Sequence, residues 1–488
     1  MTPYLVGIDL GTTTCRCAVF EPDGRELLTV YREVRVDYPR PLWAEVEPDG
    51  WWRCVVEVVR EAVDGVDASR IAAVGLSGLM HAPVLLDREN RPLAPAMLWM
   101  DQRCAPQCQA MNQAASDGER RQFATTVSAP KLRWLAEARP DLIARAGTFV
   151  LPKDYVRIRL TGVGGTDTSD AGGTGLWDRE REDWLPGAVE LAGIPRSLLP
   201  ETHPAAALAG TVTPAAAAES GLPAGTPVAF GGSDVYCTRI AVGPLGEGEV
   251  CLYMGTAAWM AFLDAQGRPR GFGSTATTGA ALRWARDLLA DDPPAAYRLP
   301  SGRGAIGASY ERFLDGVERI APGAEGLFFL PHLMGERGPT PEPLARGGLI
   351  GLTLRHGRAH IARAVLEGTA FQVRRNFEER APSPVRSGVV AGGAAKSQLW
   401  MQILVDVVGA PLRVPATAES SVLGAAMLGG VAAGLFTLPE AQAAMVRPGP
   451  TFRPDPARAA GYDALYRRYC QLDAMLLPWF REVGESAW

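Results

Sequence analysis

The chain has 488 residues, of which 47% are hydrophobic and 21% charged, a balance that is typical of a globular protein and excludes a disordered or fibrous one. Its net charge of −5 and its scattered arginines exclude a broad basic surface for nucleic acid. No apolar run is long enough to cross a membrane, and Asp9 interrupts the first apolar stretch, so we expect a cytoplasmic protein without a signal peptide.

The length predicts two domains, because one hydrophobic core seldom serves more than about 250 to 300 residues. Strand-like runs at 4–10, 12–20, 71–76 and 82–87 alternate with helical patterns such as 51–63, which predicts α/β layers. The eight cysteines lack zinc-ligand spacing and are expected to be reduced thiols.

The first strand, 4–10, contains Asp9 and is followed by Gly11 and three threonines, Thr12, Thr13 and Thr14. A carboxylate at this place can hold a hydrated Mg²⁺, the glycine allows a polyanion to approach the backbone, and the threonines offer donors to phosphate oxygens. The pattern predicts nucleotide-phosphate chemistry, with an ordinary hairpin turn as the structural alternative.

The plan of strand, Gly-Thr turn and strand recurs at 249–263, where the turn is Gly255-Thr256. We therefore interpret the chain as an architectural duplication, with a first domain at 1–242 and a second at 243–488. Before the boundary, an apolar strand at 227–230 ends in two glycines, Ser233 and Asp234.

A third glycine turn, at 392–393, joins a short strand to a helix predicted at 398–408. Such a junction exposes backbone amides against which a flat ring or a phosphate can lie, and tight packing of the helix on the strand is the equal alternative. The small residues of 420–434 predict a further helix that packs closely on its neighbours.

Taken in order, these segments resemble the FGGY family of carbohydrate kinases from residue 4 to about residue 436. The segments 347–352 and 360–367 together fit the C-terminal signature of that family, and 129–135 resembles its N-terminal signature. The resemblance implies an α/β protein of two ribonuclease H-like domains, of the kind found in actin and hexokinase, with an ATP and sugar cleft between them.

Within the family, the motifs are most similar to those of xylulokinases: 78–81 (GLMH), 98–103 (LWMDQR), 151–155 (LPKDY) and 169–174 (SDAGGT). Glycerol kinases would carry Arg-Glu where this chain has Met80-His81. Two departures are Val235, where xylulokinases usually have Asn, and a segment at 262–284 that is shorter than the family pattern, as if a hairpin were missing. Activity on another ketose therefore stays open.

The resemblance implies ATP and Mg²⁺ as cofactors and assigns roles to individual residues. The implied site residues are Asp234 as the catalytic base, Asp9 and Asp234 for the metal, Met80, His81, Trp99, Asp101 and Asp234 for the sugar, and Thr12, Thr13, Thr14, Gly255, Thr256, Gly279, Gly393 and Ser397 for the nucleotide. Structural alternatives are a turn carboxylate for Asp234, a satisfied structural histidine for His81 and a helix-start glycine for Gly279. His332 is expected to be structural.

We therefore expect phosphorylation of D-xylulose to D-xylulose 5-phosphate by ATP. The alternatives are a kinase for another ketose, a polyol or an aldonate, such as ribulose or gluconate, and a nucleotide-binding sensor on the same fold without fast transfer. The expected partners are the sugar and ATP, with no nucleic acid and no membrane, and a homodimer is the candidate assembly.

Overall fold

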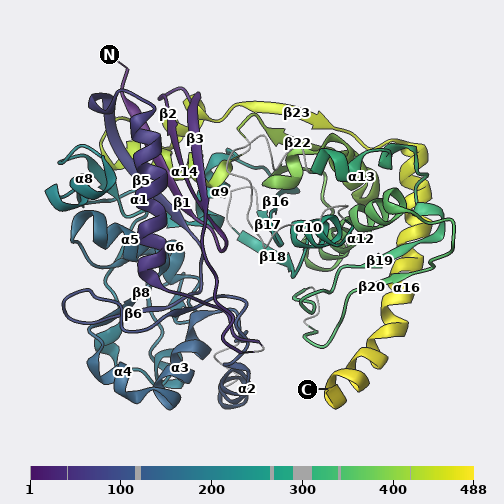
Figure 1. Cartoon of the computed structure of the whole chain (residues 1–488), viewed down its shortest axis with the longest axis horizontal. Helices are drawn as coiled ribbons and strands as arrows, with labels where there is room; N and C mark the ends of the chain where they lie inside the picture. Colours follow the sequence, from purple (N-terminus) through teal and green to yellow (C-terminus); the bar gives the residue numbers. More distant parts are fainter. Residues whose placement is uncertain are drawn as a thin grey trace. The chain divides into compact units, whose positions relative to one another are not determined.

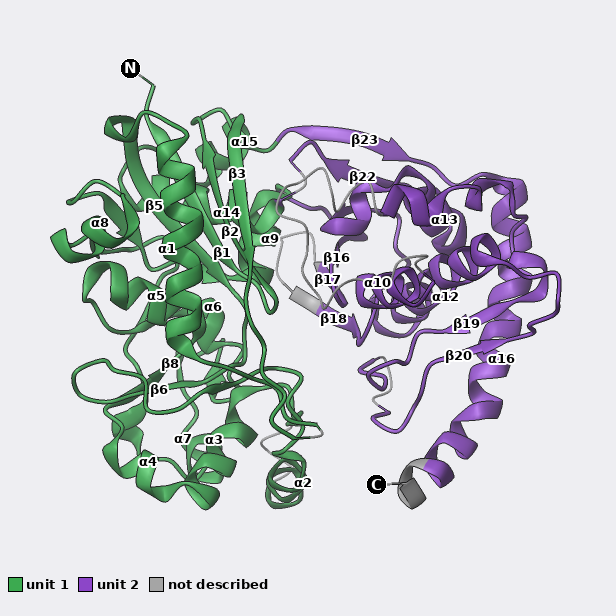
Figure 2. Ribbon diagram, in the orientation of Figure 1, with its two compact units in different colours: residues 1–243, 420–446 green, residues 244–419, 447–488 purple. Residues whose placement is uncertain are grey.

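The computed structural model in Figure 1 describes residues 2–40, 42–115, 123–263, 269–289, 310–338, 342–417 and 419–487. The chain divides into two compact units, coloured separately in Figure 2. The first contains residues 1–243 and 420–446, and the second contains residues 244–419 and 447–488. The first boundary lies beside the predicted one, but the segment 420–446 returns to the first unit, so the second unit is not continuous to residue 488.

The first unit is built on a mixed sheet in the order β13, β14, β5, β1, β2, β3, with β15 beside the end of β5. Strands β1 to β3 form an antiparallel meander, while β5 runs parallel to β1 and β14 runs parallel to β5. The strand bounds are β1 Tyr4–Leu10, β2 Thr14–Phe20, β3 Glu26–Glu33, β5 Ile71–Gly78, β13 Leu208–Thr211, β14 Pro227–Ala229 and β15 Gly232–Ser233.

The second unit repeats this plan, in the order β18, β17, β16, β21, β22, β23. Strands β16 to β18 form an antiparallel meander, and β21 and β22 continue the sheet in parallel. The bounds are β16 Glu249–Met254, β17 Ala258–Leu263, β18 Pro269–Thr275, β21 Ser387–Ala391, β22 Leu412–Pro415 and β23 Pro448–Phe452. The predicted duplication is confirmed; part of the shortened segment, residues 264–268, lies outside the described residues.

Helices and short strand pairs complete both units. The helices of the first unit are α1 Pro48–Asp64, α2 Ala105–Ala114, α3 Ser128–Ala138, α4 Pro140–Arg145, α5 Pro152–Thr161, α6 Thr168–Ala171, α7 Pro186–Leu191, α8 Pro214–Ser220, α9 Asp234–Ala241, α14 Ser420–Ala432 and α15 Leu438–Met445, and those of the second are α10 Gly279–Leu288, α12 Arg358–Arg380, α13 Gln398–Val408 and α16 Pro456–Ala487. The short pairs are β4 Glu45–Val46 with β7 Ala96–Met97, β6 Val84–Leu86 with β8 Thr148–Val150, β9 Thr166–Asp167 with β12 Thr202–His203, β10 Trp177–Asp178 with β11 Asp183–Trp184, and β19 Phe328–Leu330 with β20 Gly348–Ile350. Among the described helices, none combines the length and the apolar character needed to cross a bilayer.

Successive residues of β1 point to opposite faces of the sheet, and both faces are covered. Val6 and Ile8 belong to the apolar cluster that contains the buried stripe of α1, whereas Leu5 belongs to the cluster that contains α14. Every residue of β1 is therefore buried, as expected for a strand between two layers of helix.

Glycines in β1 and β5 allow α14 to approach the sheet at backbone distance. A Cβ atom at Gly7 would lie 2.1 Å from the carbonyl oxygen of Val422, and one at Gly75 would lie 1.7 Å from that of Ala425. No side chain fits at either position, which accounts for the glycine at each and confirms the close helix packing predicted for 420–434.

Gly75→Ala should therefore destabilise the first unit strongly. Overpacking a core typically costs about 1 to 3 kcal/mol, and the obstacle at Gly75 is rigid backbone, so we expect the upper end of that range or more. The measurement is the urea midpoint of purified protein. Gly164→Ala is the matched control, because a Cβ there meets nothing within 4 Å, and its midpoint should stay near wild type. Equal midpoints for the two variants would contradict the packing argument.

Candidate active site

Asp234, the predicted base, begins α9 directly after β15. Strand β15 runs parallel to the end of β5, with Gly232 opposite Ser77 and Ser233 opposite Gly78. The Ser233 hydroxyl accepts the Tyr236 amide at 3.2 Å and caps the helix, while the Asp234 carboxylate accepts the Val235 amide at 2.8 Å. The strand end and the cap together fix the start of α9, and with it the half-buried carboxylate.

Asp9 lies near the end of β1, in register with Ser77 on the neighbouring β5. Its side chain is buried, and one oxygen lies 3.6 Å from a guanidinium nitrogen of Arg16. The other oxygen, Oδ1, has no hydrogen-bond partner among the described residues. A buried carboxylate oxygen without a partner is costly, and a cation is one ligand that would satisfy it.

The charge of Asp9 acts on Asp234. Burial, and to a smaller extent the negative charge of Asp9, raise the pKa of Asp234 to about 7. Among the described residues, no three His, Cys, Asp or Glu side chains are grouped closely enough to hold a metal by themselves. Two acidic residues at the ends of the strands on either side of β5 do fit Mg²⁺, which is commonly held by one or two carboxylates, water and substrate phosphates.

The threonine turn after β1 is closed by a hydrogen bond from the Gly11 amide to the Thr14 carbonyl at 2.7 Å. The three threonines are only half buried. Thr12 is linked to a predicted sugar residue, because the indole Nε1 of Trp99 donates to its hydroxyl at 2.9 Å. The structure therefore joins the predicted phosphate turn directly to the predicted sugar pocket, a contact that the sequence does not indicate.

Met80 and His81 lie together against Gly173. His81 Nδ1 donates to the Gly173 carbonyl at 2.7 Å, and the backbone of His81 is left-handed, with φ of 75°. A Cβ at Gly173 would come within 2.2 Å of the Met80 methyl carbon and within 3.3 Å of the His81 ring. Gly173, in the 169–174 motif, thus supports the loop that carries both side chains.

Asp101 is fully buried, and both of its oxygens are engaged within the protein. Oδ2 accepts the Ala44 amide at 2.7 Å and Arg103 Nη2 at 2.6 Å, and Oδ1 accepts Arg103 Nε at 2.9 Å. Arg103 in turn pairs with Glu45 at 2.6 Å and lies 3.5 Å over the Trp43 ring. In this geometry the carboxylate holds Arg103 and turns no oxygen to solvent, and the expectation that Asp101 accepts sugar hydroxyls stays a prediction.

In the second unit, the predicted nucleotide residues form two glycine turns. The Gly279 amide donates to the Gly255 carbonyl at 2.8 Å, and the Thr256 carbonyl accepts the Ala280 amide at 3.0 Å, so the first turn and the start of α10 are one hydrogen-bonded unit. Gly279 thus begins a helix, as the structural alternative had it, and also packs on the predicted phosphate turn.

The second of these turns, 392–397, carries Gly393 and Ser397. A Cβ at Gly393 would meet nothing within 4 Å, while the Ser397 hydroxyl accepts the Trp400 amide at 3.3 Å and caps α13. Tyr253 lies between the two turns: its ring is 2.6 Å from a Cβ built at Gly255 and 3.1 Å from one built at Gly392. The sequence pattern does not single out Tyr253, whose only signal is its position near the end of β16.

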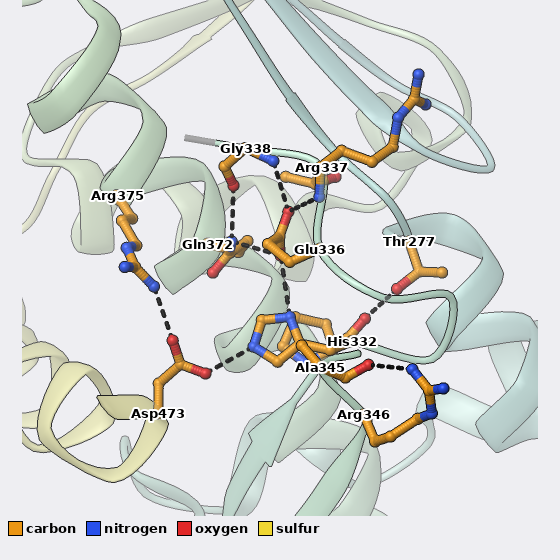
Figure 3. A network of polar contacts seen from close by, with 12 residues as sticks. Thr277, His332, Glu336, Arg337, Gly338, Ala345, Arg346, Gln372, Arg375 and Asp473 are labelled. Atoms are coloured by element: carbon orange, nitrogen blue, oxygen red, sulfur yellow. Dashed lines mark hydrogen bonds and ion pairs between the residues drawn. The ribbon is translucent and has the colours of Figure 1, made fainter. Parts of the chain in front are cut away.

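His332 is the centre of a buried polar network, shown in Figure 3. Its Nδ1 bonds to Glu336 at 2.9 Å and its Nε2 to Asp473 at 2.8 Å. Burial alone would lower the pKa of the imidazole, but the two carboxylates outweigh it and raise the pKa to about 9. Gln372 and Arg375 of α12 complete the network by donating to Glu336 and Asp473. The imidazolium thus joins its loop to α12 and α16, which supports the structural role expected for His332.

Comparisons with known proteins match almost the whole chain. The N-terminal domain of the FGGY family of carbohydrate kinases matches residues 4–241, and the C-terminal domain of that family matches residues 264–433. The xylulose kinase of Bacillus subtilis is 30% identical over 492 residues, which cover 96% of each chain. The glycerol kinase of Gloeobacter violaceus is 34% identical over 457 residues, which cover 88% of each chain. The crystal structure of xylulose kinase from Rhodospirillum rubrum has a TM-score of 0.78 at 29% identity, covering 98% of this chain and 100% of that one.

Asp234→Asn should stabilise the metal-free protein at pH 8. The unfolded carboxyl has a pKa near 3.8 and the folded one a pKa of about 7, so the fold loses stability as the pH rises between these values and regains none above them. An uncharged amide removes this penalty, which for a half-buried group is on the order of 1 kcal/mol.

The measurement is thermal unfolding in EDTA at pH 5 and pH 8, where the gain of the variant over wild type should be larger at pH 8. Asp141→Asn is the control. Because Arg139 lowers the pKa of that exposed carboxyl, this variant should lose stability rather than gain it, and the loss should not grow from pH 5 to pH 8. A gain for Asp234→Asn that is no larger at pH 8 than at pH 5 would contradict the raised pKa.

Proposed function

The chain belongs to the FGGY family of carbohydrate kinases, and on that premise we propose that it phosphorylates D-xylulose with MgATP to give D-xylulose 5-phosphate and ADP. The observation that carries the choice of sugar is the pair Met80 and His81, seated on Gly173. This pair stands where glycerol kinases would carry Arg-Glu, and an imidazole beside a thioether suits a sugar that offers both oxygen atoms and a carbon edge.

The proposed base is Asp234. A general base works best when its pKa lies near the working pH, and a carboxyl with a pKa of about 7 meets that requirement at neutral pH. In the reaction, Asp234 would take the proton of the attacking sugar hydroxyl while the γ-phosphoryl group of ATP is transferred to that oxygen. Its position at the N-terminus of α9 stabilises the carboxylate form that accepts the proton.

The remaining residues bind and orient. We assign Thr12, Thr13 and Thr14 in the first unit, and Gly255 and Thr256 in the second, to phosphate oxygens. Mg²⁺, held by Asp9 and Asp234 through water, would neutralise charge on the phosphates during transfer. Gly279, Gly393 and Ser397 are the proposed contacts to the nucleoside.

A polyol kinase is the second candidate, since the glycerol kinase relative is as similar in sequence as the xylulose kinase relatives. The Met80-His81 pair favours the ketose. A nucleotide-binding sensor would have no use for a base with a raised pKa beside a sugar loop, and it is distinguished by the absence of phosphoryl transfer.

A coupled ADP-release assay over pentuloses, hexuloses, polyols and aldonic acids tests the proposal. We expect the highest kcat/KM with D-xylulose, and we expect Asp234→Ala to lose about two to four decades of rate while still binding ATP, because the base acts on the sugar hydroxyl. The phosphorylated carbon is identified by NMR of the product. Preference for glycerol or gluconate would move the assignment to another substrate. If none of the sugars, polyols or aldonic acids stimulated ADP release, the proposal of a sugar kinase would be refuted.

His81→Ala and Trp99→Phe should differ in their effects on the KM values for sugar and ATP. Loss of the imidazole is expected to raise the sugar KM about ten-fold or more with little change in the ATP KM, because a buried hydrogen bond is worth on the order of 1 to 3 kcal/mol. Trp99→Phe loses the bond to Thr12 and should raise the KM of both substrates. Steady-state kinetics with each substrate varied provides the measurement; equal shifts of both KM values in His81→Ala would indicate a purely structural histidine.

A further inference from the structure

A fully buried lysine lies beneath the end of β5. The Lys153 ammonium is 2.6 Å from Asp154, 2.9 Å from Asp167 and 3.1 Å from Asp170, and all four side chains are withdrawn from solvent. Its Cβ lies 2.8 Å from the position that a Cβ on Gly78 would occupy, so the lysine packs directly under the strand end. The motif 151–155 that supplies Lys153 has no part in the function proposed above.

The charges of this cluster make it costly to break. Burial alone would lower the pKa of Lys153, but its three carboxylate neighbours outweigh burial and raise it, so the ammonium stays charged. A buried charge that loses its partner is strongly destabilising, whereas the intact cluster holds its members in one arrangement. The cluster is thus suited to fixing the segment that carries two of its carboxylates.

That segment is the short helix α6 with its flanking residues, and it touches both halves of the proposed site. Asp167 caps α6 by accepting the Ser169 amide at 2.7 Å. The Ser169 hydroxyl accepts the amide of Ser233 at 2.9 Å, one residue before the proposed base. At the other end, the Gly173 carbonyl accepts His81 Nδ1 at 2.7 Å.

We propose that Lys153, Asp167 and Asp170 anchor α6 as a single positioning element, which fixes the general base through Ser169 and Ser233 and fixes the sugar loop through Gly173 and His81. The proposal rests on the proposed function for the roles of Asp234 and His81. None of the anchoring residues touches the reacting atoms, so all of them act through α6. The buried ammonium of Lys153 thereby sets the distance between the base, Asp234, and the sugar hydroxyl that Asp234 deprotonates.

The two contacts of α6 predict different kinetic effects. Ser169→Ala removes only the contact to Ser233, so kcat should fall about ten-fold or more while both KM values stay within about two-fold. Ser169→Thr keeps the hydroxyl and should restore most of the rate. Asp170→Asn is nearly isosteric and loosens the anchor itself, so it should lower kcat and also raise the sugar KM.

Ser220→Ala is the matched control. Ser220 is another buried serine of the first unit, and its hydroxyl donates to the Ala216 carbonyl at 2.7 Å within α8, a helix that packs on α1 and α5. This variant should retain wild-type kinetics. If Ser220→Ala lost as much rate as Ser169→Ala, the loss would be a general effect of removing a buried serine hydroxyl, and the positioning role of Ser169 would be contradicted.

Hydrogen exchange of the sugar-free protein, followed by mass spectrometry, supplies a readout that does not depend on the substrate. Ser169→Ala should speed exchange in the segment around 232–236 alone, and Asp170→Asn should speed it there and around 79–82. If no sugar is phosphorylated by wild type, the proposed function fails, and the exchange data still judge the anchor. Unchanged exchange in both segments of Asp170→Asn, or wild-type kcat in Ser169→Ala, would overturn the inference.

Discussion

The contact of α14 with the backbone of β1 and β5 is the constraint on which the first unit depends. Gly7 and Gly75 leave no space for a side chain beneath the carbonyls of α14, so the helix and the two strands have one mutual position. Asp9 lies near the end of β1, and β5 leads into the loop that carries His81. The same helix presses on α9, where a Cβ at Gly424 would lie 2.0 Å from the Cys237 carbonyl, and so it also fixes the element that begins with Asp234.

This arrangement explains why the site can hold charges that oppose folding. Asp9 and Asp234 are placed at the ends of the strands on either side of β5, where burial and the charge of Asp9 favour the protonated form of Asp234. Such strain persists only where the surrounding packing allows no relaxation, and close helix-on-sheet contact supplies that rigidity. A carboxylate that destabilises the free protein is also one that readily takes a proton from a substrate, so stability and reactivity are set by the same placement.

The buried charges elsewhere have a different purpose. The Lys153 cluster and the His332 network both balance a buried cation with carboxylates, and both tie segments that are distant in sequence. His332 joins its loop to the last helix of the second unit, whereas Lys153 lies under the predicted sugar loop of the first. The surroundings of each cation, rather than its chemistry, distinguish the two: those of His332 indicate a structural role, and those of Lys153 connect it to the proposed site.

The sequence by itself determined the elements whose residues interact locally. The bounds of β1 and α13 follow from the hydrophobic pattern, and the repeat of strand, Gly-Thr turn and strand identified the duplicated plan. Asp234 could be predicted as a candidate because a strand that ends in glycines and an acid is a local feature. Tertiary structure alone decided that 420–446 returns to the first unit, that Asp101 accepts the Ala44 amide, that Trp99 bonds to Thr12 and that α6 connects Ser233 with His81. These contacts join residues tens to hundreds of positions apart, and their partners are chosen by how helices and strands pack, which no local pattern of hydrophobic and polar residues encodes.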